Sequence, residues 1–188
     1  MHRFLSLAAV LALAVAIACS DDLLGTPTVA NAIDTVTLGA LEGTPISVAS
    51  GYNISTGAVR TDDPNVGVSF EFAYNVRKLG DGTYQRVFLP RAALVGAGST
   101  ADPGLLRQTK TFAEITRAAS NGYTADSAVP IQVGERYLVR SRVVCVSLGV
   151  PLYGKLEILS FQDSTVTFKV LTDLNCGFRD LNVGLPEN

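Results

Sequence analysis

The chain has 188 residues, of which 47% are hydrophobic and 17% are charged. This composition is too apolar for an intrinsically disordered protein, and the length suits one domain around one hydrophobic core. The formal net charge is −2, and it becomes slightly more negative if Arg3 leaves with an export signal. A weakly acidic chain lacks the basic surface that binds phosphates, so no nucleic-acid partner is expected.

The first 18 residues have the pattern of an export signal. His2 and Arg3 give a positive start, and residues 4–18 are apolar apart from one serine. This run is shorter than the roughly 20 residues that a membrane-spanning helix needs. We therefore expect residues 1–18 to be a signal peptide that is cleaved.

Cys19 follows this signal directly. The segment from Ala16 to Cys19 resembles the lipobox of bacterial lipoproteins, with alanine at the position where leucine is most common. Cys19 is thus the expected lipidation site, and the alternative is ordinary cleavage nearby that leaves Cys19 as a free thiol. Each buried methylene of a lipid contributes about 0.8 kcal/mol, so a multiply acylated protein stays on the membrane. The expected location is the bacterial envelope, on the periplasmic face or the cell surface.

Residues 19–32 are rich in small residues, glycine and proline, and show no hydrophobic periodicity. This composition predicts a flexible tether. Beyond it, residues 33–188 contain no repeat and no break in composition, so they are predicted to form a single domain. That domain holds Cys145 and Cys176, an even pair that is expected to form a disulfide in an oxidising compartment. Two buried free thiols are the alternative.

The clearest local signal is the alternation of large apolar residues from Val66 to Val76, which has a period of two. It predicts a strand, and the turn residues that follow, with a second run from Tyr84 to Leu89, predict a hairpin. Further strands are predicted at 34–41, 45–49, 136–146, 153–161 and 165–171, the last three as an antiparallel meander.

One short helix is predicted after Thr111, because Glu114 follows at the spacing of a capping box. The expected fold is mainly β: a single antiparallel β-sandwich or curled-sheet domain with one short helix, after a signal peptide and a linker. The pattern does not separate a sandwich from a barrel.

The only histidine is His2, and the only methionine is Met1, so both leave with the signal. Their loss excludes a Ser-His-Asp triad, a histidine-bearing zinc site and haem ligation by histidine or methionine. Motifs of serine hydrolases and nucleotide-binding loops are also missing. No catalytic residue, metal ligand or cofactor is therefore predicted. Glycoside hydrolysis needs only two carboxylates, but Glu71 and Glu157 look like solvated sheet positions.

Three arginines, Arg136, Arg140 and Arg142, fall on one face of a predicted strand and could form an anion-binding patch. The alternative is that they pair across the sheet with acids such as Glu157. The pairs Asp62–Asp63 and Asp81–Gly82 lie where turns are expected, so turn chemistry is preferred to calcium binding. Core packing is likewise preferred to a binding groove for five tyrosines: Tyr52, Tyr84, Tyr123, Tyr137 and Tyr153.

Three segments carry a resemblance to a known family: FAEITRAASNGYTAD at 112–126, RYLVRSR at 136–142 and YGKLEILSF at 153–161. Their order resembles the HmuY-like bacterial lipoproteins over about residues 70–170. The resemblance implies a lipid-anchored, mostly β protein. The family's named activity is haem capture through two histidines, and no residue of this chain can take that role, so haem is not expected as a cofactor.

The expected function is that of a noncatalytic envelope lipoprotein. It would use the membrane as a partner through its lipid anchor and would bind a small ligand or an envelope protein. A purely structural lipoprotein is the alternative, and a carboxylate-based glycosidase is a remote one.

Overall fold

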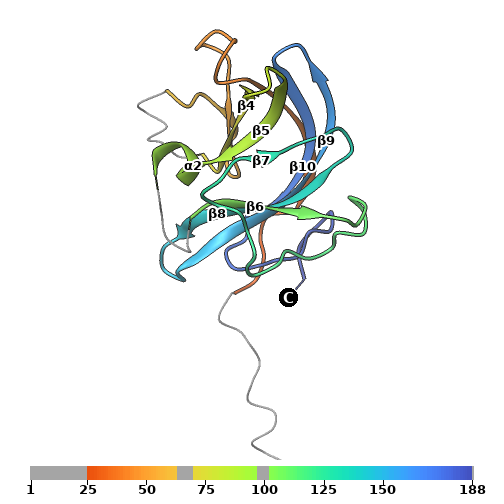
Figure 1. The fold of residues 1–188 in the computed structure, drawn as a ribbon. Coiled ribbons are helices and arrows are strands. Elements are labelled where there is room, and N and C mark those ends of the chain that lie inside the picture. The colour runs from red at the N-terminus through yellow and green to blue at the C-terminus, as the bar shows by residue number, and fades with distance from the viewer. Residues whose placement is uncertain (1–24, 63–69, 97–101, 188) are drawn as a thin grey trace, which may run out of the picture.

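Two antiparallel sheets of five strands face each other in the computed structural model of the chain (Figure 1). The structure describes residues 25–62, 70–96 and 102–187. The predicted signal peptide and Cys19 lie outside these ranges. The predicted mainly β fold of the sandwich type is confirmed. Within the described ranges, no helix has the length and apolar character needed to cross a membrane.

The first sheet has the strand order β1-β10-β9-β8-β6. Its strands are β1 (Ala32–Gly39), β6 (Gly104–Gln108), β8 (Arg136–Cys145), β9 (Val150–Gln162) and β10 (Thr165–Asp173). Strands β8, β9 and β10 form the predicted antiparallel meander. Strand β1 then pairs with β10, from Ala32 opposite Thr172 to Gly39 opposite Thr165.

The second sheet has the order β3-β2-β4-β5-β7. Its strands are β2 (Gly51–Asn53), β3 (Gly57–Val59), β4 (Phe72–Lys78), β5 (Tyr84–Pro90) and β7 (Val129–Pro130). The predicted hairpin is confirmed in β4 and β5, which pair from Phe72 opposite Pro90 to Lys78 opposite Tyr84.

Aromatic side chains fill the space between the sheets. Phe72 of β4 and Phe88 of β5 lie 4.4 Å apart between ring centroids, and Phe88 meets Phe168 of β10 edge-on at 5.8 Å. All three rings are fully buried. Each such pair contributes about 0.5–1.5 kcal/mol beyond its buried area. These contacts join the two sheets, because Phe168 belongs to the first and the other two rings to the second.

The predicted strand from Val66 to Val76 is only partly observed. Residues 63–69 lie outside the described ranges, and the chain bends at Glu71 before β4 begins. Phe70 consequently packs with Val59 and Ala73 in a separate cluster and does not share the face of Phe72.

The predicted strand at 45–49 is wrong, because this segment forms turns. The N–H of Val48 donates to the carbonyl of Pro45 at 2.9 Å, which closes a turn in the segment itself. Proline also lacks the N–H that a sheet ladder needs.

The predicted helix after Thr111 is wrong as well. Its capping box forms, since the N–H of Thr111 donates to the Glu114 carboxylate at 2.9 Å, but only a single turn follows. The carbonyls of Phe112 and Ile115 accept hydrogen bonds from the Lys155 ammonium at 2.9 and 2.8 Å. A longer helix would use these carbonyls for its own ladder. The described helix is instead α2 (Arg91–Val95), beside β5.

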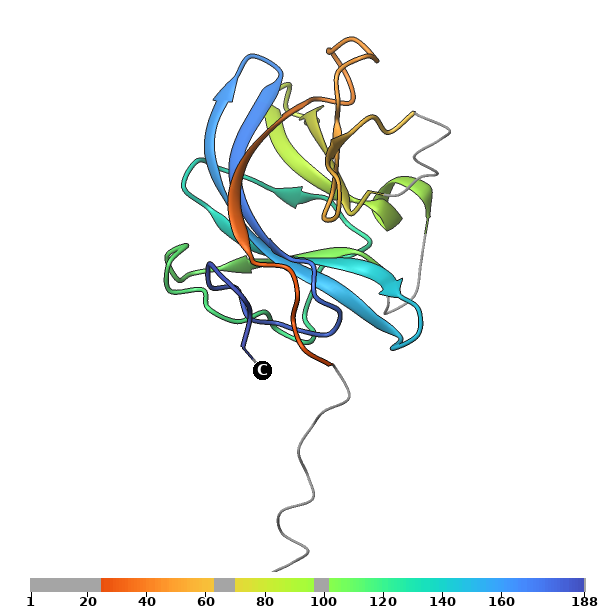
Figure 2. The same cartoon turned by 180° about the vertical axis from the view of Figure 1, so that it is seen from behind.

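The sandwich has two distinct ends. The first described residues and the C-terminus lie together at the lower end in Figure 1, and Figure 2 shows the same arrangement from behind. The β9–β10 hairpin and the loop 41–50 lie at the upper end. We call these the terminal end and the distal end.

Candidate functional site

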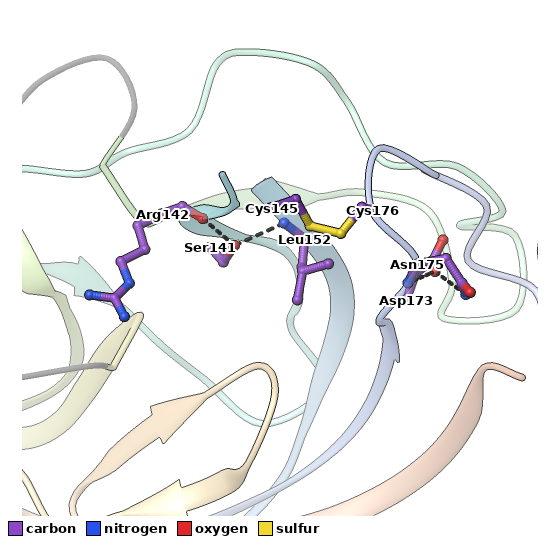
Figure 3. The surroundings of a disulfide bond; sticks show 7 residues. All are labelled: Ser141, Arg142, Cys145, Leu152, Asp173, Asn175 and Cys176. Carbon is purple, nitrogen blue, oxygen red and sulfur yellow. Dashed lines mark hydrogen bonds between the residues drawn. A yellow bond between two sulfur atoms is a disulfide. The ribbon is translucent and has the colours of Figure 1, made fainter. Parts of the chain in front are cut away.

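A disulfide joins two loops at the terminal end. Cys145 ends β8 and Cys176 follows β10, and their Cα atoms lie 5.8 Å apart (Figure 3). The predicted pairing is thus confirmed in the structure. The bond fixes the loop after β10 to the β8–β9 hairpin. The two cysteines are 31 positions apart in the sequence, and closing a loop of this length stabilises the fold by about 3–4 kcal/mol on the chain-entropy estimate.

The strand that leads to Cys145 contains a β-bulge. The register of β8 against β9 shifts between Arg140 and Val143, which leaves main-chain groups without their regular partners. The hydroxyl of Ser141 accepts from the N–H of Leu152 at 2.8 Å and donates to the carbonyl of Arg142 (Figure 3). A buried serine thereby satisfies the interrupted ladder.

The residue before Cys176 binds the amino-terminal segment. The side-chain oxygen of Asn175 accepts from the N–H groups of Thr28 and Val29 at 2.8 and 3.0 Å. Its side-chain nitrogen donates to the carbonyl of Val29 and to the carboxylate of Asp173, both at 2.8 Å. Figure 3 shows Asp173 and Asn175 side by side, next to the disulfide.

A second contact lies next along the chain. Asn31 and Gly184 exchange main-chain hydrogen bonds of 2.7 and 3.0 Å, and the Asn31 side chain donates to the carbonyl of Asp180 at 2.9 Å. We call residues 28–31 with Asn175 and Gly184 the amino-terminal clasp. Residues of the segment 19–32, which was predicted to be a flexible tether, thus contact the domain from Thr28 onward.

Asp173 is fully buried, and its carboxylate accepts hydrogen bonds from the main chain and the side chain of Asn175. Burial raises the pKa of Asp173, and the two hydrogen bonds from Asn175 oppose that rise. The sequence offered only a weak signal for this site, namely a cluster of polar residues beside Cys176. Asn31 and Asn175 were not singled out from the sequence.

The three arginines of the predicted anion patch do not form one stripe. The guanidinium of Arg140 lies 4.8 Å from the ring centroid of Tyr123 and donates to the carbonyl of Asp102 at 3.0 Å. Arg142 follows the bulge, and its charge acts on Glu71, beside the other sheet. The bulge interrupts the alternation that would have aligned them.

The predicted pairing with Glu157 is not the one observed. Arg136 lies opposite Glu157 in register, but the carboxylate binds the ammonium of Lys169 at 2.7 Å. The Arg136 side chain is partly buried, and its Nε has no hydrogen-bond partner among the described residues.

The prediction that Glu71 is exposed to solvent is wrong. Glu71 is only 3% exposed, and the chain bends at this residue before β4 begins, which interrupts the alternation that would have placed it in solvent. The carboxylate accepts from the N–H of Ile54 at 2.7 Å. Burial raises the pKa of Glu71 to about 7, although that hydrogen bond and the charge of Arg142 oppose the rise.

The structure shows turn chemistry at Asp81 and core packing for three of the five tyrosines. Asp81 accepts from the N–H and the hydroxyl of Thr83, which is turn chemistry. Tyr52, Tyr137 and Tyr153 are buried as core residues, whereas Tyr84 is exposed. Among residues 25–62, 70–96 and 102–187, no three histidine, cysteine or acidic side chains are grouped to hold a metal ion.

A recess lies beside the β9–β10 hairpin, toward the distal end. It has a volume of about 270 Å³ and is lined by Arg86 and Tyr84 of β5, by Val133, and by Phe161 of β9. The guanidinium of Arg86 lies 4.7 Å from the ring centroid of Phe161. No sequence motif pointed to these residues, because β5, β7 and β9 bring them together only in the folded chain.

Comparison with protein families, with curated proteins and with solved structures found no match to this chain. The resemblance to HmuY-like lipoproteins stays a prediction.

Proposed function

We propose that this protein is a noncatalytic lipoprotein of the bacterial envelope that is anchored through Cys19 and binds a small ligand or a partner protein away from the anchor. One observation supports this division of roles. The amino-terminal segment is clasped at one end of the sandwich, and the recess lies beside the hairpin that forms the other end.

The clasp limits how far the domain can move from a lipid on Cys19. Thr28 lies nine positions after Cys19, and a fully extended chain of that length spans at most roughly 30 Å. The terminal end would therefore stay near the membrane surface, and the distal end would point away from it. Such an orientation suits a protein that presents a binding site to the periplasm or the medium.

The test is membrane fractionation of Cys19→Ala in the native type of host. We expect the wild-type protein to remain with membranes after a carbonate wash and the variant to be released, because the lipid is the only proposed anchor. A variant with Cys145→Ser and Cys176→Ser is the matched control and should stay bound. Retention of Cys19→Ala in the washed membranes would contradict the proposal.

A further inference from the structure

Arg86 is the only charged residue among the described residues that line the recess beside the β9–β10 hairpin. Arg86 is partly buried, and its Nε has no hydrogen-bond partner among the described residues. The ion pairs within the described ranges involve other cations, namely Arg60, Arg107 and Lys169. A desolvated cation that lacks an anion is costly, and a ligand that supplies one removes that cost.

A second unmet donor lies beside this guanidinium. Tyr74 is fully buried, and its O–H has no acceptor in the described part of the chain. Its ring lies nearly parallel to that of Phe161, with centroids 6.4 Å apart. Burial raises the pKa of Tyr74, and the charge of Arg86 and its hydrogen-bonding contact with the phenol oxygen oppose the rise, so the phenol is neutral and can donate. The Tyr74 O–H and the Arg86 Nε–H thus both lack an acceptor among the described residues.

The recess has a mixed lining, in which exposed apolar side chains lie beside the polar Gln85 and Gln132. Tyr84 is 69% exposed and Val133 is 59% exposed, and the ring of Phe161 forms part of the wall. Exposed aromatic and aliphatic groups around a concave site are typical of ligand contacts. A volume of about 270 Å³ limits the ligand to a compact molecule.

We propose that this recess binds a small carboxylate with an aromatic or apolar body, whose anionic group pairs with Arg86 and whose body lies against Tyr84, Val133 and Phe161. The inference names the ligand class of the proposed binding function and therefore rests on it. A guanidinium can bind a carboxylate through two parallel hydrogen bonds, and Phe161 holds the Arg86 side chain in place by stacking.

The experiment is calorimetric titration of the purified full-chain product with 2-naphthoate as the probe. The neutral 2-naphthamide, which has the same ring system, is the matched ligand control. We expect saturable binding of the carboxylate and at least about tenfold weaker binding of the amide, since a charge-assisted hydrogen bond is lost.

Two arginine variants test where the probe binds. Arg86→Gln should weaken 2-naphthoate binding by about tenfold or more. Arg77→Gln is the matched control, because Arg77 lies on the same hairpin, faces the opposite side of the sheet and is exposed; it should bind like the wild type. Tyr84→Ala, which changes an exposed side chain, should weaken the binding of both probes. This variant tests the site if Arg86→Gln does not fold.

Absence of 2-naphthoate binding, equal binding of the amide, or an equal loss in Arg77→Gln would overturn the inference. Calorimetry measures binding whether or not the chain is lipidated, whereas fractionation measures anchoring alone. A failure of one proposal is therefore distinguishable from a failure of the other.

Discussion

The side chain of Asn175 binds the main chain of Val29 through both of its groups. Its oxygen accepts from the N–H of Val29 at 3.0 Å, and its nitrogen donates to the carbonyl at 2.8 Å. The amide side chain thus replaces a neighbouring strand for this one residue. Because Cys176 follows directly, the clasp is fixed to a loop that the disulfide holds in place.

We predict that Asn175→Ala opens the clasp. The variant loses the acceptor for Thr28 and Val29 and should lower the free energy of unfolding by about 1–2 kcal/mol. Hydrogen exchange followed by NMR should show faster exchange of these two amides. Asn121→Ala, which changes an exposed asparagine, is the control. Unchanged protection of Thr28 and Val29 would show that the clasp does not depend on Asn175.

We predict that the disulfide contributes about 3–4 kcal/mol to the free energy of unfolding. A variant with Cys145→Ser and Cys176→Ser should lose this amount in urea denaturation, and the wild type under strong reductant should match it. Without reductant, neither cysteine should react with an alkylating reagent in the unfolded protein. Alkylation of both would mean that the thiols are free.

We predict that the wild type loses stability as the pH rises from about 4.5 to 7. The pKa of Glu71 is raised to about 7 in the folded state, from 4.5, so the folded chain binds a proton that the unfolded chain has released. Stability is then fully present below the lower value and lost through the higher one. Residues 3–188 contain no histidine that would titrate in this window.

Glu71→Gln tests this prediction. Its free energy of unfolding should vary less between pH 5 and pH 7.5 than that of the wild type, by roughly 1–3 kcal/mol. Urea denaturation at four or five pH values measures the difference. Glu157→Gln, at a partly exposed ion pair, is the control and should keep the wild-type slope. Parallel profiles for Glu71→Gln and the wild type would disprove the assignment.

We predict that Lys155→Met destabilises the segment after Thr111. The ammonium of Lys155 satisfies the carbonyls of Phe112 and Ile115, and its loss should cost about 1–3 kcal/mol. Lys169→Met is the control, because Lys169 also lies 4.6 Å from the Phe112 ring but makes a more exposed ion pair, worth about 1 kcal/mol or less. Equal losses in thermal denaturation would contradict a special role for Lys155.

Segments with a strong local pattern were predicted well. The alternation around Phe72 and Tyr74, the turn at Asp81 and the three runs after Arg136 all appear as strands or turns close to the expected positions. The two late cysteines were also paired correctly, because their number and the expected compartment allow only one intramolecular pair.

Features that depend on distant contacts were not predicted. The capping box at Thr111 is present, but Lys155 of another strand takes the carbonyls that a helix would need. Glu71 alternates like a solvent-facing residue, but the chain bends there and its buried carboxylate accepts from the N–H of Ile54. The strands β2, β3, β6 and β7 were also not predicted, because they are too short to show a hydrophobic alternation.

The sequence by itself determined the mainly β character and the disulfide pair, because both follow from hydrophobic period and residue type, whereas the export signal stays a prediction. Only the tertiary structure decided where the amino-terminal segment binds and which groups surround Arg86. Val29 and Asn175 are 146 positions apart, and no local pattern encodes a contact over that distance. Such contacts depend on how the whole chain packs its two sheets.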